Sequence, residues 1–158
     1  MQLLDACRSL TKITLVVSLL VISACGSDAD PFGPIVLGGL SMNIDGVPWT
    51  AISAQGTSTG GIVAIGAADA TGVAFGFAFQ GAAPGTYVIG PGNPNNATYS
   101  VGSNAWAATG AGGGSGTMTI TTLSGERVVG TFSFQVNASG TQTPATVSLT
   151  NGVFDIEF

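Results

Sequence analysis

Short segments in which hydrophobic and polar residues alternate fill most of this chain. The pattern is clearest late in the sequence, where Met118 and Ile120 alternate with threonines and where Val128, Phe132 and Phe134 share one face of a longer segment. Alternation with a period of two is typical of a β-strand with one buried and one solvated face. No window shows the 3.6-residue apolar spacing of an amphipathic helix, so the sequence predicts an all-β domain.

Turn residues divide this domain into strands. Asp45-Gly46 and Asn151-Gly152 are each a strong signal for a two-residue hairpin turn. Together with the alternation they predict strands at residues 40–44, 47–53, 61–67, 72–79, 86–89, 99–101, 105–108, 117–123, 128–136, 146–150 and 153–158. Some ten strands at a spacing of roughly 8–12 residues predict an antiparallel β-sandwich, with a closed lipocalin-like barrel as the alternative. We expect residues 73–79 and 153–158 as candidates for exposed edge strands.

The N-terminal segment has a different character. A short positive region, Arg8 and Lys12, precedes an apolar run over residues 13–22 that is too short to span a bilayer. This layout predicts a secretory signal peptide over residues 1–24. Its end, Ile22-Ser23-Ala24-Cys25, resembles the bacterial lipobox, in which the cysteine is acylated and becomes the new N-terminus. We therefore predict lipidation at Cys25.

Residues 26–34 are small, acidic and interrupted by proline. Such a segment buries little apolar surface and is typical of a tether. We therefore expect a lipidated N-terminus and flexible tether over residues 25–34, followed by one all-β domain over residues 35–158. Gly26 follows the cysteine, and by the usual enterobacterial sorting rule this predicts a lipid anchor in the outer membrane, facing the periplasm or the cell surface.

Charge and cysteine content exclude several classes of protein. Cleavage before Cys25 leaves one basic residue, Arg127, and seven acidic residues, a net charge of −6. A chain with this balance lacks the basic surface that nucleic acids require, so no nucleic-acid partner is expected. Cys25 is then the sole cysteine and the chain has no histidine, which excludes an intrachain disulfide and a Cys/His metal cluster. No cofactor is expected.

Carboxylates are the remaining candidates for acid–base chemistry or metal binding. Asp155 and Glu157 project from the same face of the last predicted strand, roughly 6–7 Å apart, and are weak candidates for a metal site. The simpler interpretation is that the opposite face enters the core and leaves both acids in solvent. Asp45 and Asp69 lie in turns, where such side chains commonly bond their own backbone. The sequence therefore predicts that the protein is not an enzyme.

Four motifs spread over the domain carry a family resemblance. They are Ile44-Asp45-Gly46-Val47-Pro48-Trp49, Gly85-Thr86-Tyr87-Val88-Ile89-Gly90, Gly130-Thr131-Phe132-Ser133-Phe134 and Thr150-Asn151-Gly152-Val153-Phe154-Asp155. Together they resemble a family of small, uncharacterised bacterial lipoproteins that form a domain of unknown function. The resemblance implies a lipid-anchored all-β domain and supplies no catalytic residues.

Three functions are consistent with the sequence. The first is a non-enzymatic cell-envelope lipoprotein, held in the membrane by its lipid, that binds a glycan or an envelope protein through a Thr/Ser/Asn-rich sheet face and the loops at 90–96 and 103–116. The second is a small outer-membrane β-barrel, suggested by the apolar segment 73–79 and the terminal Phe158. The third is a lipocalin-like carrier in which Phe75, Phe77 and Phe79 line a cavity; a filled core is the simpler expectation.

Overall fold

The computed structural model describes residues 39–158 and contains eleven strands. The predicted signal peptide, the lipidation site Cys25, the tether at 25–34 and residues 35–38 of the predicted domain lie outside the described residues. Between Gly39 and Phe158 no helix is long and apolar enough to cross a membrane. The prediction of an all-β domain is confirmed.

The strands follow one another through short turns. They are β1 (Leu40–Ile44), β2 (Val47–Thr50), β3 (Ser53–Thr59), β4 (Ile62–Ala68), β5 (Val73–Gln80), β6 (Gly85–Ile89), β7 (Asn96–Val101), β8 (Asn104–Ala108), β9 (Ser115–Leu123), β10 (Arg127–Ala138) and β11 (Thr146–Glu157). All pairings are antiparallel.

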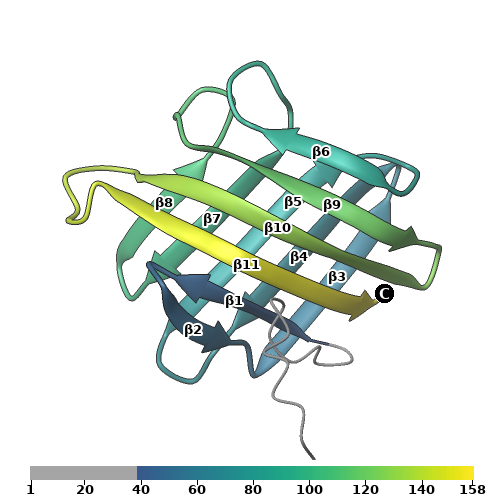
Figure 1. The fold of residues 1–158 in the computed structure, drawn as a ribbon, viewed down its shortest axis with the longest axis horizontal. Coiled ribbons are helices and arrows are strands. Elements are labelled where there is room, and N and C mark those ends of the chain that lie inside the picture. The colour runs from purple at the N-terminus through teal and green to yellow at the C-terminus, as the bar shows by residue number, and fades with distance from the viewer. Residues whose placement is uncertain (1–38) are drawn as a thin grey trace, which may run out of the picture.

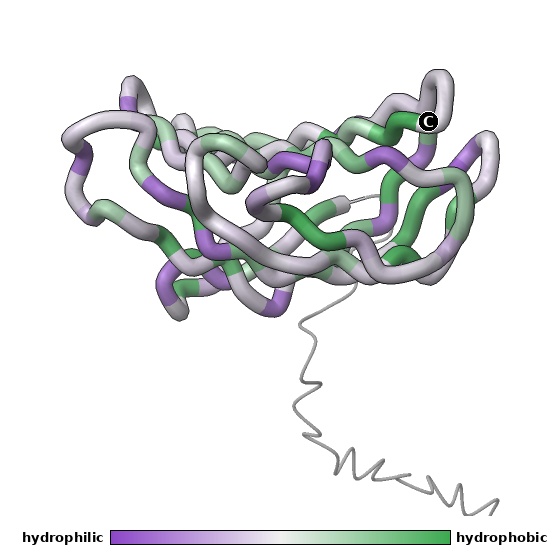
Figure 2. Tube along the Cα trace, turned by 90° about the horizontal axis from the view of Figure 1, so that it is seen from above, coloured by the Kyte–Doolittle hydropathy of each residue, from purple (hydrophilic) through white to green (hydrophobic). Residues whose placement is uncertain are grey.

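The strands form a single sheet that curls into a half-barrel with two facing layers (Figure 1). The front layer has the order β2-β1-β11-β10-β9-β6 and the back layer β8-β7-β5-β4-β3. The long strand β10 joins the layers, because Asn137 and Ala138 at its end pair with Ala107 and Trp106 of β8. Among the described strands β2 and β3 end the main path without pairing to each other, so the sheet is not the closed barrel of the alternative fold. Figure 2 shows the two layers edge-on.

Phenylalanine rings fill the space between the layers. Phe75 of β5 stacks on Phe132 of β10 with ring centroids 5.0 Å apart, and Phe77 meets Phe154 of β11 edge-on at 5.1 Å. These side chains and Phe79 are nearly fully buried. Ring-to-ring contact is the close packing expected of a protein interior. The run from Phe75 to Phe79 is therefore part of the core.

Asn151-Gly152 does not form the predicted hairpin. Both residues lie inside the continuous strand β11, with Asn151 in the left-handed region at φ 52°. The register runs from Phe132↔Gly152 to Phe134↔Leu149, so β11 carries one extra residue, and the pairing with β1 shifts at the same place. This is a β-bulge. The dipeptide forms a bulge because β1 and β10 pair with β11 on both of its sides.

Two expectations about edges are also wrong. Residues 73–79 and 153–158 are not exposed edges, because β5 lies between β4 and β7, and β11 lies between β1 and β10. The real end of the back layer is β3, which has no large hydrophobic residue and is absent from the strands that the sequence predicts. Its inward positions are the small residues Ala54 and Gly56, and a methyl group on Gly56 would lie 3.0 Å from the Ile156 side chain.

Glycines face phenylalanines across neighbouring strands of the front layer. Gly152 pairs with Phe132, and Gly130 pairs with Phe154. A methyl group on Gly152 would lie 2.4 Å from the Phe132 ring, and one on Gly130 would lie 2.7 Å from the Phe154 ring. The rings thus occupy the space that side chains would otherwise fill, an arrangement that stabilises glycines in sheets. These contacts fix β10 and β11 beneath the outer surface described next.

Candidate functional site

The outer surface of the front layer is a face of uncharged hydroxyl and amide side chains. On β9 the buried Met118 and Ile120 alternate with exposed threonines, and β10 repeats the pattern around its phenylalanines. We call the outward residues the hydroxyl face: Ser115, Thr117 and Thr119 of β9, Thr131, Ser133 and Gln135 of β10, and Ser148 and Thr150 of β11. The predicted Thr/Ser-rich sheet face is therefore present in the structure.

The strand register places these hydroxyl groups in rows across the strands. Thr119 lies opposite Thr131, and Thr117 lies opposite Ser133. The first row extends to β6, where the hydroxyl oxygens of Thr86 and Thr119 are 3.4 Å apart. A hydroxyl group both donates and accepts hydrogen bonds and turns to suit its partner. The face thus offers repeated, adaptable hydrogen-bonding groups without charge.

The hydroxyl face is hollowed next to the bulge. A shallow hollow of about 350 Å³ is lined by Thr117, Thr119, Thr131, Phe132, Ser133, Thr150, Asn151 and Gly152. A second hollow of about 450 Å³ shares Thr117, Ser133 and Thr150 with the first and extends toward Ser115 and Ser148. Because Asn151 is the extra residue of β11 and Gly152 has no side chain, the bulge forms one wall of the first hollow. Sequence reasoning misses this feature because an Asn-Gly pair is typical of a turn.

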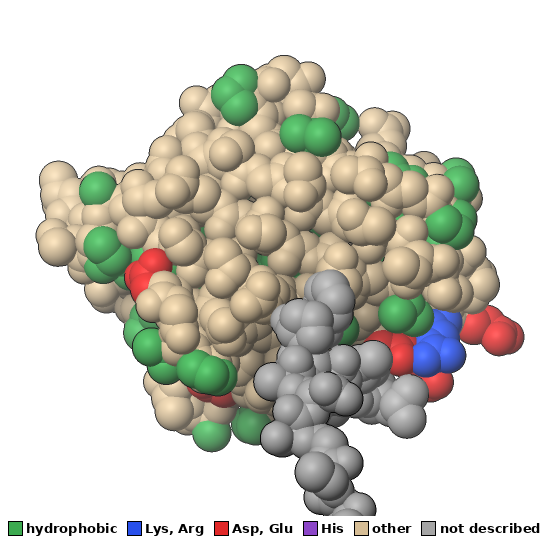
Figure 3. All heavy atoms as spheres, viewed as in Figure 1, with side chains coloured by type: hydrophobic (Ala, Val, Ile, Leu, Met, Phe, Trp, Pro, Cys, Tyr) green, Lys and Arg blue, Asp and Glu red, His purple; other side chains and the backbone are tan. Residues whose placement is uncertain are grey.

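Charged side chains gather at one end of the front layer. In the space-filling view most of the visible face carries neither charged nor hydrophobic side chains, while the one basic group and neighbouring acids lie at its lower right margin (Figure 3). The basic group is Arg127, the sole cation between residues 39 and 158. Its strand position is opposite Glu157 of β11.

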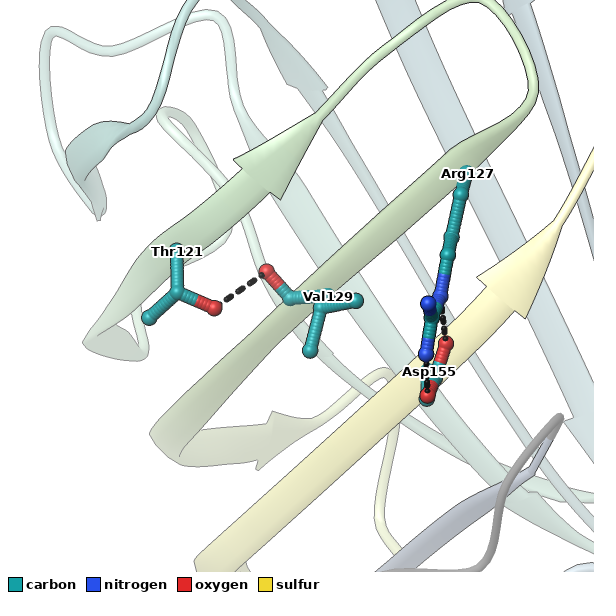
Figure 4. Close-up of polar contacts among 4 residues, drawn as sticks. All are labelled: Thr121, Arg127, Val129 and Asp155. Atoms are coloured by element: carbon teal, nitrogen blue, oxygen red, sulfur yellow. Dashed lines mark hydrogen bonds and ion pairs between the residues drawn. The ribbon is translucent and has the colours of Figure 1, made fainter.

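Arg127 holds Asp155 with a two-point ion pair (Figure 4). The Arg127 Nε donates to Oδ1 at 2.7 Å, and Nη2 donates to Oδ2. Asp155 is only 3% exposed, so the expectation that it lies in solvent is wrong. The hydrogen bond and charge of Asp155 raise the pKa of Arg127 above its ordinary value. Both Asp155 oxygens are thus engaged by the guanidinium, whereas Glu157 is exposed.

The two aspartates Asp45 and Asp69 stabilise turns. Asp45 accepts a hydrogen bond from the Ser148 backbone N–H at 2.8 Å, which links the β1–β2 turn to β11. Asp69 accepts from Trp49 Nε1 at 2.7 Å and from the backbone and hydroxyl of Thr71. Within residues 39–158 no three His, Cys, Asp or Glu side chains come together as a metal site. These carboxylates act as structural hydrogen-bond acceptors.

Desolvation and hydrogen bonding have opposite effects on the pKa of Asp69. Desolvation works to raise the pKa of its carboxyl group, but hydrogen bonds from Trp49, Thr71 and Val73 outweigh it and hold the pKa below the ordinary value of 3.8. The same end of the molecule contains the buried Tyr99, whose pKa is raised by burial and by the charges of Asp45 and Asp69. Two charged turns therefore lie near one end of the back layer's β7.

The loops proposed from sequence as binding loops are anchored to the sheet. In the first, the buried Asn95 accepts from the Gln80 N–H at 2.9 Å and donates to the Val88 carbonyl at 2.8 Å, which joins β5 to β6. In the second, Thr109 bridges to Gly113 in a tight turn. Both loops rise from the same end of the molecule (Figure 1). The structure does not bring either loop's residues into the lining of the first hollow.

Comparison with known proteins identifies a family without an assigned activity. A family model described as Domain of unknown function (DUF6252) matches residues 38–155, nearly all of the described chain. No curated protein and no solved structure matches the chain. The predicted resemblance to a domain of unknown function is thus confirmed, and the lipoprotein character stays a prediction.

Proposed function

The chain belongs to the DUF6252 family of domains of unknown function, and we propose that it is a lipid-anchored, non-enzymatic binding module of the bacterial cell envelope. Its ligand is an uncharged glycan that lies along the hydroxyl face. The observation that carries this proposal is the pair of adjoining hollows beside the bulge, lined by hydroxyl, amide and backbone groups together with Phe132 and Phe134.

The chemistry of the face favours a neutral, hydroxyl-rich ligand. Sugars present many hydroxyl groups that need both donors and acceptors, and threonine and serine supply both from one atom. The charged groups of Arg127 and Asp155 bind each other and lie toward the margin of the layer. The face therefore gives a charged ligand no partner of opposite sign. Strands rather than loops carry the groups, which keeps their spacing fixed.

The anchor follows from the sequence. Cys25 ends a lipobox-like segment, and two acyl chains give stable membrane attachment where one chain binds only marginally. Metabolic labelling with a palmitate analogue tests this directly. We expect label on the wild-type chain and none on Cys25→Ala. Label that persists on Cys25→Ala contradicts the anchor.

Glycan binding is tested by retention of the detergent-solubilised full chain on neutral polysaccharide beads. The variant Thr117→Val/Thr131→Val removes two hydroxyl groups from the hollow while it conserves side-chain shape. We expect it to lose at least about fivefold in retention, since each of the two lost hydrogen bonds contributes about 0.5–1.5 kcal/mol. The matched control is Thr57→Val on the exposed strand β3 of the other layer, which should bind as wild type. Equal retention of both variants contradicts the proposed site.

A further inference from the structure

The segment that follows the first hairpin turn carries no charge and exposes large hydrophobic side chains. Residues 47–52, which we call the β2 rim, read Val-Pro-Trp-Thr-Ala-Ile and comprise strand β2 and the two residues after it. Val47 is 66% exposed and Ile52 74%, the two highest values among the large hydrophobic residues that the structure leaves exposed. Trp49 and Ala51 between them are partly buried against the core. Exposed large hydrophobic residues grouped on one margin mark an interaction site more often than residues scattered singly do.

The β2 rim lies at the margin of the front layer, next to the point where the described chain begins. β2 ends the layer, with β1 as its neighbour (Figure 1). The Ala51 N–H donates to the Leu40 carbonyl at 2.9 Å, so Ile52 is close to the first strand residue. Figure 3 shows hydrophobic side chains gathered along this lower margin of the molecule.

The length of chain before Gly39 keeps this margin near the bilayer. Thirteen residues lie between Cys25 and Gly39, and the chain from one to the other reaches at most about 50 Å even when fully extended. A surface held this close to a membrane meets it at high effective concentration, so a small apolar contact is enough to orient the domain. We propose, on the basis of the lipid anchor above, that the β2 rim docks on the polar–apolar boundary of the lipid surface.

The composition of the rim favours lipid over a second protein strand. Trp49 presents an apolar ring with a polar N–H, the type of side chain that is enriched at membrane interfaces. That N–H donates to Asp69, which places a carboxylate beside the rim and limits how deeply it enters the bilayer. Pro48 has no N–H, and proline on an edge strand opposes the addition of another strand. The rim therefore has the features of a lipid contact.

Docking of this margin would also orient the binding surface. The hydroxyl face lies on β9, β10 and β11 of the same layer, and β1 lies between these strands and the rim. With β2 on the membrane, the front layer stands away from the lipid and β6 is the strand of that layer farthest from the rim. The hydroxyl face would then be open to a glycan network beside the membrane.

The two tryptophans of the chain allow a direct test. Trp106 is 4% exposed and donates to the Pro144 carbonyl at 2.8 Å, so it is an internal reference for the partly exposed Trp49. The lipidated full chain is reconstituted in phosphatidylcholine vesicles with brominated acyl chains, which quench tryptophan emission on contact. In Trp106→Phe, we expect the emission of Trp49 to fall at least about twofold, because interfacial side chains insert to the acyl boundary. In Trp49→Phe, the emission of Trp106 should not change.

A second pair of variants keeps the test valid if either single-tryptophan chain fails to fold. With both tryptophans present, Val47→Ser/Ile52→Ser should lose the quenching. Ile62→Ser/Val88→Ser removes two exposed hydrophobic residues from β4 and β6 and should retain it. Equal quenching in these two variants overturns the proposal. Absence of quenching together with a dimer in sedimentation also overturns it, because a second copy then covers the rim.

Flotation of the vesicles separates this inference from the proposed function. A chain that floats with the vesicles but shows no quenching at Trp49 has its anchor and does not dock, which overturns the inference alone. A chain that does not float lacks the anchor, which overturns both.

Discussion

Two similar dipeptides, Asp45-Gly46 and Asn151-Gly152, have different structures in this molecule. The first forms the predicted hairpin turn between β1 and β2, with both residues at positive φ. The second places only Asn151 at positive φ and forms a bulge inside β11. Both first residues adopt the left-handed conformation that Asn and Asp tolerate. The difference arises from the neighbours: β2 is an edge strand that folds back on β1, whereas β11 is paired on both sides.

The largest expected difference between the two sites is the loss of stability when the glycine of each dipeptide is replaced by alanine. In Gly152→Ala the new methyl group would meet the Phe132 ring at 2.4 Å, so we expect a loss of about 1–3 kcal/mol in the free energy of unfolding from overpacking. In Gly46→Ala nothing lies within 4 Å, and only the positive φ is unfavourable, with an expected loss of about 1 kcal/mol. Urea unfolding followed by tryptophan fluorescence measures both.

A third glycine is the control for this pair. At Gly66 of β4 an added methyl group would have no neighbour within 4 Å, and the residue has no positive φ, so Gly66→Ala should be close to neutral. If Gly152→Ala is as stable as Gly66→Ala, the proposed packing of Phe132 against the bulge is wrong.

The next expected effect concerns the ion pair that follows the bulge. The strand after Asn151 carries Asp155, and Arg127 of β10 holds it in register. Arg127→Ala leaves a buried carboxylate without this partner, and we expect a loss of about 1–2 kcal/mol, reduced from the fully buried case because Arg127 is 44% exposed. Glu126→Gln, beside it in the exposed turn, is the control and should unfold as wild type.

Deletion of Asn151 should have a small effect on stability. Without this residue Thr150 moves opposite Ser133, while Gly152 stays opposite Phe132 and Leu149 opposite Phe134, so the ladder becomes regular. Since the deletion also removes a residue in the left-handed region, we expect the free energy of unfolding to change by less than about 1 kcal/mol. Deletion of Gly46 from its two-residue turn leaves no such alternative and should be clearly more destabilising.

The smallest expected effect is a pH dependence at a third turn, which begins at Asp69. The pKa of this carboxyl is below 3.8 in the folded protein and near 3.8 when unfolded. The ionised form therefore stabilises the fold above pH 3.8, and this contribution is lost as the pH falls through the lower, folded-state value. The free energy of unfolding of wild type and of Asp69→Asn, each measured as the pH is lowered, gives this contribution. Identical acid profiles for the two chains would contradict the assigned hydrogen bonds.

The sequence predicted those features that depend on alternation within one strand. The burial of Met118, Ile120 and Phe132 and the opposite face of Thr117 and Thr131 follow from the period of two, and the structure confirms them. Contacts between distant strands could not be predicted in this way. Arg127 and Asp155 are 28 positions apart, and nothing local in the sequence indicates that the acid is buried.

Local sequence patterns also could not predict which strands lie at the edge of a layer and which lie in its middle. The inward positions of β3 are the small residues Ala54 and Gly56, so hydrophobic periodicity does not reveal this strand. The apolar composition of β5 reflects its place between two strands in the middle of a layer and not an exposed edge. The bulge at Asn151 depends on β1, which precedes β11 by more than a hundred residues.

Binding of neutral polysaccharide by the Asn151 deletion variant tests the central claim most directly. The deletion removes one wall of the hollow in the hydroxyl face but leaves every strand pair and the ion pair in place. We predict a chain whose free energy of unfolding is within about 1 kcal/mol of wild type and that is retained at least about tenfold less on the polysaccharide, the equivalent of about 1.4 kcal/mol. A stable deletion variant with undiminished retention would contradict the assignment of the hydroxyl face as the binding site.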